Sequence, residues 1–253
     1  MFTAKTKRIE ELAKLFPKVI SELESIFDNS SNIYIDWSNV IHWQDKLGWH
    51  FHTKRMKQLF DSFDTVQSVK IYSGTLEGNQ QSEDGVKELQ SLGYEVITKP
   101  VKLMKISIDT SSIPENSPAL LQQFVKKPLL ELLDIATITT LNKKLKELNQ
   151  KGTLFIEDKK CNFDVEMGRD MLRDFDLDHI ENYILWSVDS DFADPVNQIS
   201  DDGKKPIIFA TSGKVSPELA ATGVYIFDVR KIKEFICWPR EIPAEIMAKI
   251  KGT

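Results

Sequence analysis

The chain has 253 residues, of which 28 % are charged and 41 % hydrophobic, with 11 Gly, 10 Pro and two Cys. This composition is typical of a globular protein with one elaborated domain or two small ones, and it excludes disordered, collagen-like and disulfide-stabilised chains. The net charge of −5 argues against a nucleic-acid partner, because Lys and Arg drive phosphate binding. However, residues 164–202 carry twelve acidic residues against two Arg, so the rest of the chain is net positive.

Cysteine usage and hydropathy predict a reduced, cytoplasmic setting. Cys161 and Cys237 have no CxxC spacing and are too few for a disulfide framework. The N-terminus lacks the apolar core of a signal peptide, and no run approaches about 18 uncharged apolar residues. We therefore expect no membrane partner.

The first hundred residues alternate helical and extended patterns. A helical pattern over 5–27 is interrupted at Pro17. The elements that follow are a strand at 33–35, a helix at 51–63, a strand at 69–73, a helix at 82–92 and a strand at 94–99. This βαβαβ order predicts a parallel sheet with right-handed crossovers.

The middle of the chain interrupts this alternation. Residues 106–119 read as a loop and 120–150 as two helical stretches, so we expect an insertion at about 106–150. The pattern then resumes with strands at 153–156, 184–188, 206–209 and 225–228 and helices at 163–175, 194–200 and 217–222. We expect a helical extension at 1–30, a main domain at 31–235 and a C-terminal extension at 236–253.

Carboxylates follow two of the predicted strands. Asp36 and Asn39 come after the first strand, and the run Asp189-Ser190-Asp191 comes after 184–188. Ligands of parallel α/β sheets bind at the carboxyl ends of the strands, where the strand order reverses. A single Asp in such a place is usually a helix N-cap. A helix needs only one capping residue, whereas three carboxylates follow these two strands: Asp36, Asp189 and Asp191. This excess of carboxylates favours a ligand site.

An all-oxygen, Asp-rich set suits Mg²⁺ or Mn²⁺. The four histidines do not form a zinc set, because three lie in one loop and His179 lies far away. A bound divalent ion promotes hydrolysis of phosphodiesters, which also need cations nearby. Five lysines are candidates for this contact, although an ordinary solvated surface is the alternative: Lys99, Lys102, Lys105, Lys159 and Lys160.

Three segments in order resemble the NYN domain, of the PIN-like nuclease superfamily, including its LabA-like proteins. The segments are 33–39, 160–165 and 187–192, and a late strand precedes Ser212-Gly213. The resemblance covers roughly residues 31–230. It implies a three-layer α/β/α, Rossmann-like fold with a mainly parallel sheet, here with an added N-terminal helix and helical insertion. It also implies a Mg²⁺- or Mn²⁺-dependent ribonuclease.

The resemblance also assigns roles to residues. Asp36, Asp164 and Asp189 would be metal ligands, with Asp191 a ligand or an orienter of metal-bound water, and we expect the first three carboxylates to converge within reach of one ion. The supporting residues would be Asn39, Ser190 and Asp170. Asp170 matches the pattern, but six helical residues rotate by about 600°, so it would not lie beside Asp164. Trp37 is either a core residue or a surface on which an RNA base stacks.

Two other functions stay open. One is a catalytically inactive module of the same fold that binds RNA or protein. The other is a phosphatase of the haloacid-dehalogenase type, which needs a second Asp two residues after the first, whereas this chain has Ser38. The N-terminal helix and the insertion are candidates for substrate selection or for a homodimer contact. We expect the remaining acids of the acidic segment to be solvated surface, namely Asp174, Asp176, Asp178, Asp201 and Asp202.

Overall fold

The computed structural model describes residues 1–107, 110, 112–151, 155–177, 179–211 and 213–251. The chain forms two compact units, which are Met1–Pro100 with Cys161–Thr253, and Val101–Lys160. Within the described residues, no helix has the length and apolar character needed to cross a membrane.

The larger unit is built on six parallel strands in the order β3-β2-β1-β6-β7-β8. The strands are β1 (Ser31–Asp36), β2 (Val66–Thr75), β3 (Glu95–Pro100), β6 (Asn182–Trp186), β7 (Lys205–Ala210) and β8 (Tyr225–Asp228). All residues of β1 and β6 are buried, which explains their continuous apolar runs. The chain leaves β1 toward β2 and β3, and leaves β6 in the opposite direction toward β7 and β8. The strand order therefore reverses between β1 and β6.

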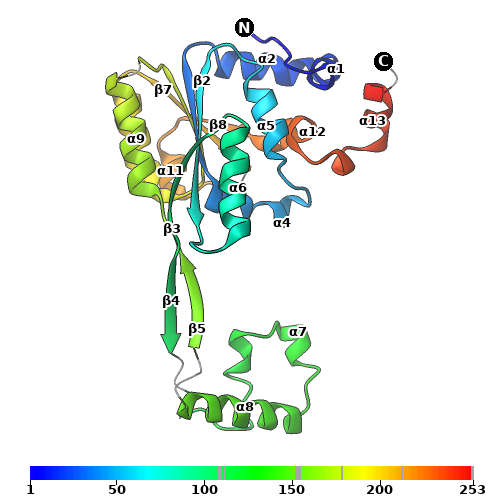
Figure 1. Ribbon diagram of the computed structural model, residues 1–253, viewed down its shortest axis with the longest axis vertical. Coiled ribbons are helices and arrows are strands. Elements are labelled where there is room, and N and C mark those ends of the chain that lie inside the picture. Colours follow the sequence, from blue (N-terminus) through cyan, green and yellow to red (C-terminus); the bar gives the residue numbers. More distant parts are fainter. Residues whose placement is uncertain (108–109, 111, 152–154, 178, 212, 252–253) are drawn as a thin grey trace. The chain divides into compact units, whose positions relative to one another are not determined.

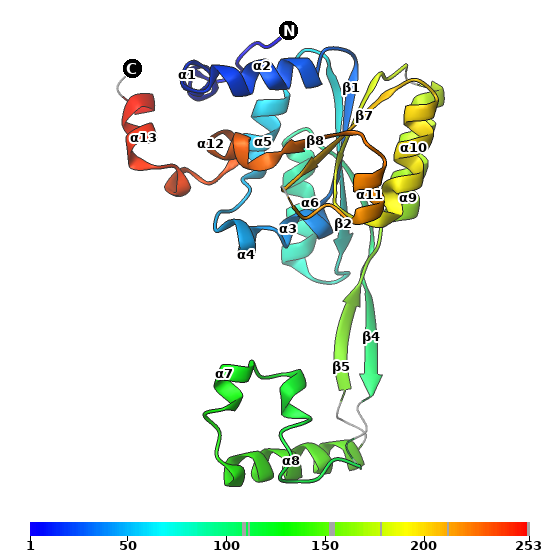
Figure 2. The ribbon, with the colours of Figure 1, turned by 180° about the vertical axis from the view of Figure 1, so that it is seen from behind.

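Helices cover both faces of this sheet (Figures 1 and 2). One face carries α9 (Asp164–Leu177) and α10 (Ala193–Asp201), and the other carries α5 (Thr53–Phe60) and α6 (Gln80–Ser91). A Cβ atom at Gly168 of α9 would lie 3.3 Å from Cγ of Pro195 in α10, so the glycine permits close packing of the two helices. The predicted three-layer α/β/α fold is confirmed.

Short helices surround these layers. Pro17 ends the first helical stretch and opens the second, giving α1 (Lys7–Leu15) and α2 (Pro17–Ile26), because proline is favoured in the first turn of a helix and disfavoured in its interior. The others are α3 (Trp37–Ile41), α4 (Gln44–Leu47), α11 (Pro217–Ala221), α12 (Lys233–Ile236) and α13 (Ala244–Lys251). Short 3₁₀ helices span Ser190–Phe192, Val229–Ile232 and Pro239–Glu241.

The smaller unit contains the predicted insertion at 106–150. Its strands β4 (Lys102–Ser107) and β5 (Phe155–Lys160) pair antiparallel with each other. The prediction that a strand at 153–156 resumes the main sheet is therefore wrong, and residues 153 and 154 lie outside the described residues. Between the strands lie a 3₁₀ turn (Leu121–Gln123), α7 (Lys127–Leu130) and α8 (Ile135–Gln150), which pack around Leu121, Leu130 and Ile138.

Candidate functional site

Asp36 lies at the reversal of strand order, as the last residue of β1. One of its oxygens, Oδ1, accepts a hydrogen bond from the backbone N–H of Asn39 at 3.1 Å, so Asp36 caps α3. The hydroxyl of Ser187 donates to the other oxygen, Oδ2, at 3.4 Å. Only 8 % of Asp36 is exposed. Burial raises its pKa, and the negative charge of Asp189 raises it further.

Asp189 follows β6 and joins the same site. Its Oδ1 accepts from the backbone N–H of Asp191 at 3.4 Å and from the Ser190 hydroxyl at 3.5 Å. Its own backbone N–H donates to the Ser187 hydroxyl at 3.3 Å. Ser187 is completely buried and thus connects the carboxylate of Asp36 to the loop that carries Asp189. Sequence reasoning missed its role, although it opens the Ser187–Asp191 motif.

Asp164 begins α9, and Asn162 caps this helix by accepting from the Asp164 backbone N–H at 2.8 Å. Burial raises the pKa of Asp164 to about 6. The Asn162 side chain lowers this pKa, whereas the charge of Asp189 and contact with Asp191 raise it. The Asp164 Oδ2 atom is buried without a hydrogen-bond partner among the described residues. The structure thus brings Asp164 within electrostatic reach of both acids that follow β6.

These four acids have no cationic partner in the described part of the chain: no Lys, Arg or His forms an ion pair with Asp36, Asp164, Asp189 or Asp191. For Asp36 and Asp164, burial and the neighbouring carboxylates therefore both disfavour the charged form. The expected convergence within reach of one ion is not met, because no three His, Cys, Asp or Glu side chains among the described residues are arranged to hold a metal ion.

The predicted supporting residues take different places. Asn39 contacts Asp36 through its backbone, while its side-chain oxygen accepts from the Trp43 indole at 2.9 Å. Asp170 lies six residues after Asp164 in α9, where it accepts from the Tyr72 hydroxyl at 3.0 Å and pairs with Arg169 at 2.8 Å. These contacts give Asp170 a structural role, in joining α9 to β2.

The residues that were predicted to contact RNA lie on several different elements. Lys99 pairs with Glu166 at 2.8 Å and lies over the Phe163 ring at 4.7 Å. Trp37 is half-buried against the core, near Phe51, and borders a cavity of about 280 Å³ beside α6. Lys102 is exposed on β4. The backbones of Lys105, Lys159 and Lys160 belong to the β4–β5 ladder, whereas their side chains, like Ser212, lie outside the part described.

Asp174 is buried, so the expectation that it forms part of the solvated surface is wrong. This residue of α9 is only 5 % exposed and faces the sheet. Its carboxylate accepts from the Tyr34 hydroxyl at 2.6 Å and from the Asn32 amide at 2.9 Å, and it pairs with Lys70 at 2.7 Å. With Glu166 and Asp170, it completes a row of acids at intervals of four residues that attaches α9 to the sheet through polar contacts. Asp176 and Asp201 are exposed as expected, and Asp178 lies outside the described residues.

Comparisons with known proteins agree with the motifs. The family model for the NYN domain matches residues 124–233, which contain three of the four acids. The protein LabA ("low amplitude and bright") of Synechococcus elongatus is 24 % identical over 206 residues, covering 81 % of this chain and 86 % of LabA. The predicted resemblance to the NYN family is thereby confirmed. Asp36 lies before the segment that the family model matches.

A solved structure supports the fold. It is a protein of unknown function from Vibrio parahaemolyticus, with a TM-score of 0.50 and 16 % identity, and the match covers 82 % of this chain and 95 % of the other. At this identity, the likeness is evidence for the shared architecture of sheet and helices alone.

Proposed function

We propose that this NYN-like chain is a metal-dependent endoribonuclease that hydrolyses phosphodiester bonds of single-stranded or structured RNA. The observation that carries the proposal is the grouping of four acids without cationic partners at the reversal of strand order. Open α/β sheets bind their ligands at this place. The NYN resemblance favours a nuclease of the PIN-like type over other hydrolases.

The donor set fits a divalent cation. It is composed of carboxylate oxygens, which Mg²⁺ and Mn²⁺ prefer, and the buried Oδ2 of Asp164 has no partner among the described residues. Asp36, Asp164, Asp189 and Asp191 would hold the ion. A divalent ion supplies a bound water of lowered pKa and neutralises charge on the phosphodiester oxygens.

The chain's own residues would orient this site. Ser187 restrains Asp36 and the Asp189 loop at the same time, and Ser190 restrains Asp189. The caps on α3 and on the Ser190–Phe192 turn each engage one carboxylate oxygen, Asp36 Oδ1 and Asp189 Oδ1. The second oxygen of each carboxylate is then the one placed to receive an ion, with Asp36 Oδ2 held by Ser187.

RNA binding would draw on cationic side chains and on one aromatic ring. We assign backbone contact to Lys99, Lys102, Lys105, Lys159 and Lys160, and base stacking to Trp37. Lys99 must exchange its pairing with Glu166 for a phosphate, so its contribution is smaller than that of an unpaired lysine. Because phosphate contacts release counterions, RNA affinity should fall as salt rises.

A catalytically inactive RNA-binding module is the second candidate. It is favoured by one observation, the lack of a preformed three-ligand arrangement among the described residues. Such a protein would bind RNA in EDTA and leave it intact in Mn²⁺.

Incubation of the full chain with a mixed RNA pool in Mg²⁺, Mn²⁺ and EDTA tests the proposal. We expect cleavage products with either ion and none in EDTA. RNA that stays intact in both ions, although it is bound, would establish the inactive module instead. A small phosphomonoester assayed in parallel should not be hydrolysed, and its turnover would favour the phosphatase.

A further inference from the structure

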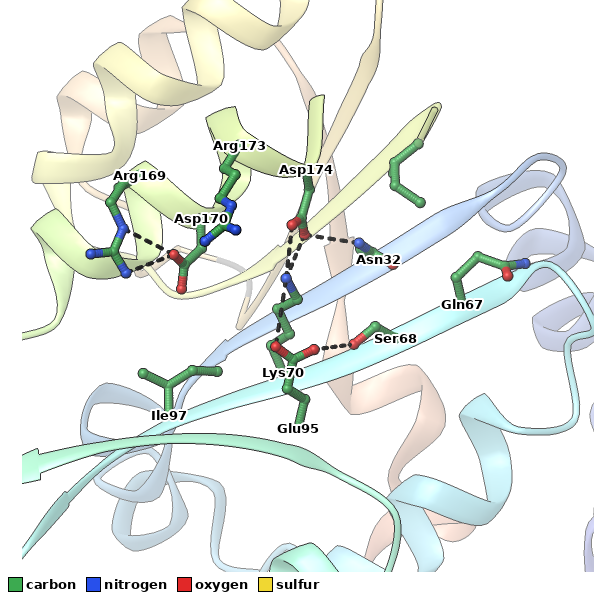
Figure 3. Close-up of a pocket in the computed structure, with 11 residues that line it drawn as sticks. Asn32, Gln67, Ser68, Lys70, Glu95, Ile97, Arg169, Asp170, Arg173 and Asp174 are labelled. Atoms are coloured by element: carbon green, nitrogen blue, oxygen red, sulfur yellow. Dashed lines mark hydrogen bonds and ion pairs between the residues drawn. The ribbon is translucent and has the colours of Figure 1, made fainter. Parts of the chain in front are cut away.

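A groove of about 710 Å³ runs between α9 and the strands β1, β2 and β3 (Figure 3). Its volume lies within the range of about 300–1,000 Å³ that is common for small-molecule sites. None of the four acids of the candidate metal site lines it, whereas both Asp170 and Asp174 do. The groove is therefore a separate feature of the larger unit.

The groove contains an unsatisfied acceptor on a buried residue. Asn32 is only 2 % exposed, and its amide NH₂ donates to Asp174 Oδ2 at 2.9 Å. This bond fixes the orientation of the amide, because a flipped amide would place two acceptors together. The Asn32 Oδ1 atom is left buried without a hydrogen-bond partner in the described part of the chain. Leaving a buried acceptor unpaired is costly, so a ligand that donates a hydrogen bond here gains from satisfying it.

The rim of the groove carries an available cation. Arg173 is exposed and makes no ion pair or hydrogen bond with any described residue, whereas Arg169, one turn earlier on α9, is held by Asp170. On the opposite side, Glu95 accepts from Ser68 at 3.0 Å and lies 3.9 Å from Lys70. Figure 3 shows Arg173 and Glu95 on different elements, α9 and β3.

These features define the ligand chemically. A neutral hydrogen-bond donor of the ligand fits beside the buried Asn32. An anionic group of the ligand fits at the solvated rim beside Arg173, because burying a charge costs far more free energy than leaving it in water. Ile97 and Ile180 add apolar surface to the lining of the groove. We propose that this groove binds a nucleoside monophosphate whose base carries an amino group, with the base toward Asn32 and the phosphate at Arg173.

Base selectivity follows from the neighbours of the unpaired oxygen. The Asp174 carboxylate lies beside Asn32, so both are acceptors on the floor of the groove. The amino group of guanine or cytosine can donate to Asn32 from the side that carries no ring acceptor, whereas the adenine amino group lies between two ring nitrogen acceptors. The ring N–H of uracil is flanked by two carbonyl groups, which would approach the carboxylate. We therefore expect weaker binding of the uridine nucleotide.

Calorimetric titration of the full chain with GMP, AMP, CMP and UMP tests the proposal. The titration is performed in EDTA on the Asp189→Asn variant, so that its outcome is independent of RNA cleavage and of a metal. We expect at least one amino-bearing nucleotide to bind more tightly than UMP. Arg173→Ala should weaken this binding about tenfold or more, whereas Arg173→Lys should weaken it less.

The control is Arg240→Ala, which removes an exposed arginine that does not line the groove. Circular dichroism should show that all variants are folded. The proposal is overturned if none of the four nucleotides binds, if UMP binds as tightly as the others, or if Arg173→Ala binds like Arg240→Ala.

Discussion

Lys70 and Asp174 form an ion pair between the sheet and α9, with the ammonium nitrogen 2.7 Å from one carboxylate oxygen and 2.9 Å from the other. Both residues are more than nine-tenths buried. Tyr34 and Asn32 donate to the same carboxylate, and burial, followed by the negative charge of Asp174, raises the pKa of Tyr34 above its ordinary value. Asp174 thus holds α9 against β1 and β2.

Removing this carboxylate should destabilise the fold strongly. Asp174→Ala leaves the buried Lys70 ammonium with only the exposed Glu95, 3.9 Å away, and leaves two side-chain donors unsatisfied, so we expect a loss of about 3–5 kcal/mol in the free energy of unfolding. Urea denaturation provides the measurement. Adding Lys70→Met to Asp174→Ala should restore part of the loss, because it removes the isolated charge. A double variant no more stable than Asp174→Ala would refute the ion-pair explanation.

Asp164 should make stability depend on pH. Its folded-state pKa of about 6 exceeds the unfolded value of about 3.9. The folded state therefore binds this proton more tightly, and the stability that it contributes below about pH 4 is lost as the pH rises through about 6. We expect Asp164→Asn to gain about 1 kcal/mol over the unmodified chain between pH 4 and 7, a figure reduced for the partial exposure of the side chain.

Urea unfolding at the two pH values, in EDTA, measures this difference. Asp201→Asn makes the same chemical change at an exposed position and should show no such trend. A difference between Asp164→Asn and the unmodified chain that is the same at both pH values would contradict the assignment.

Ser187 should act on activity through the residues that it positions. Ser187→Ala removes the hydroxyl that donates to Asp36 and accepts from the Asp189 backbone. We expect apparent Mn²⁺ affinity or cleavage rate to fall by about 10–100-fold, as is common when a residue that orients metal ligands is lost. Cleavage measured over a series of Mn²⁺ concentrations separates the two effects. An unchanged concentration dependence and rate would mean that this hydroxyl is purely structural.

Bound cation should also stabilise the folded chain. An ion that binds the folded state and not the unfolded state raises the midpoint of thermal unfolding, and the rise grows with concentration. We expect Mn²⁺ to raise the Tm of the unmodified chain and to have a much smaller effect on Asp36→Asn. Equal shifts in both proteins would place the cation elsewhere.

The sequence was most informative where burial follows local patterns. The continuous apolar residues of β1 and β6 predicted buried parallel strands, and the acids after them predicted the place where the strand order reverses. The pairing of β4 with β5 was missed, because Lys-rich segments on either side of about 47 intervening residues carry no local signal of each other. Asp174 was misjudged for a similar reason, since its partner Lys70 lies 104 positions away.

The direct test of the ribonuclease assignment is the RNA cleavage rate of Asp189→Asn in Mn²⁺, compared with the unmodified chain and with Asp201→Asn. All three proteins should have similar circular dichroism spectra, because Asp189 is at the surface end of β6 and caps only a short turn. We predict that Asp189→Asn loses at least about 100-fold in rate while Asp201→Asn retains full activity. Undiminished cleavage by Asp189→Asn would contradict the assignment.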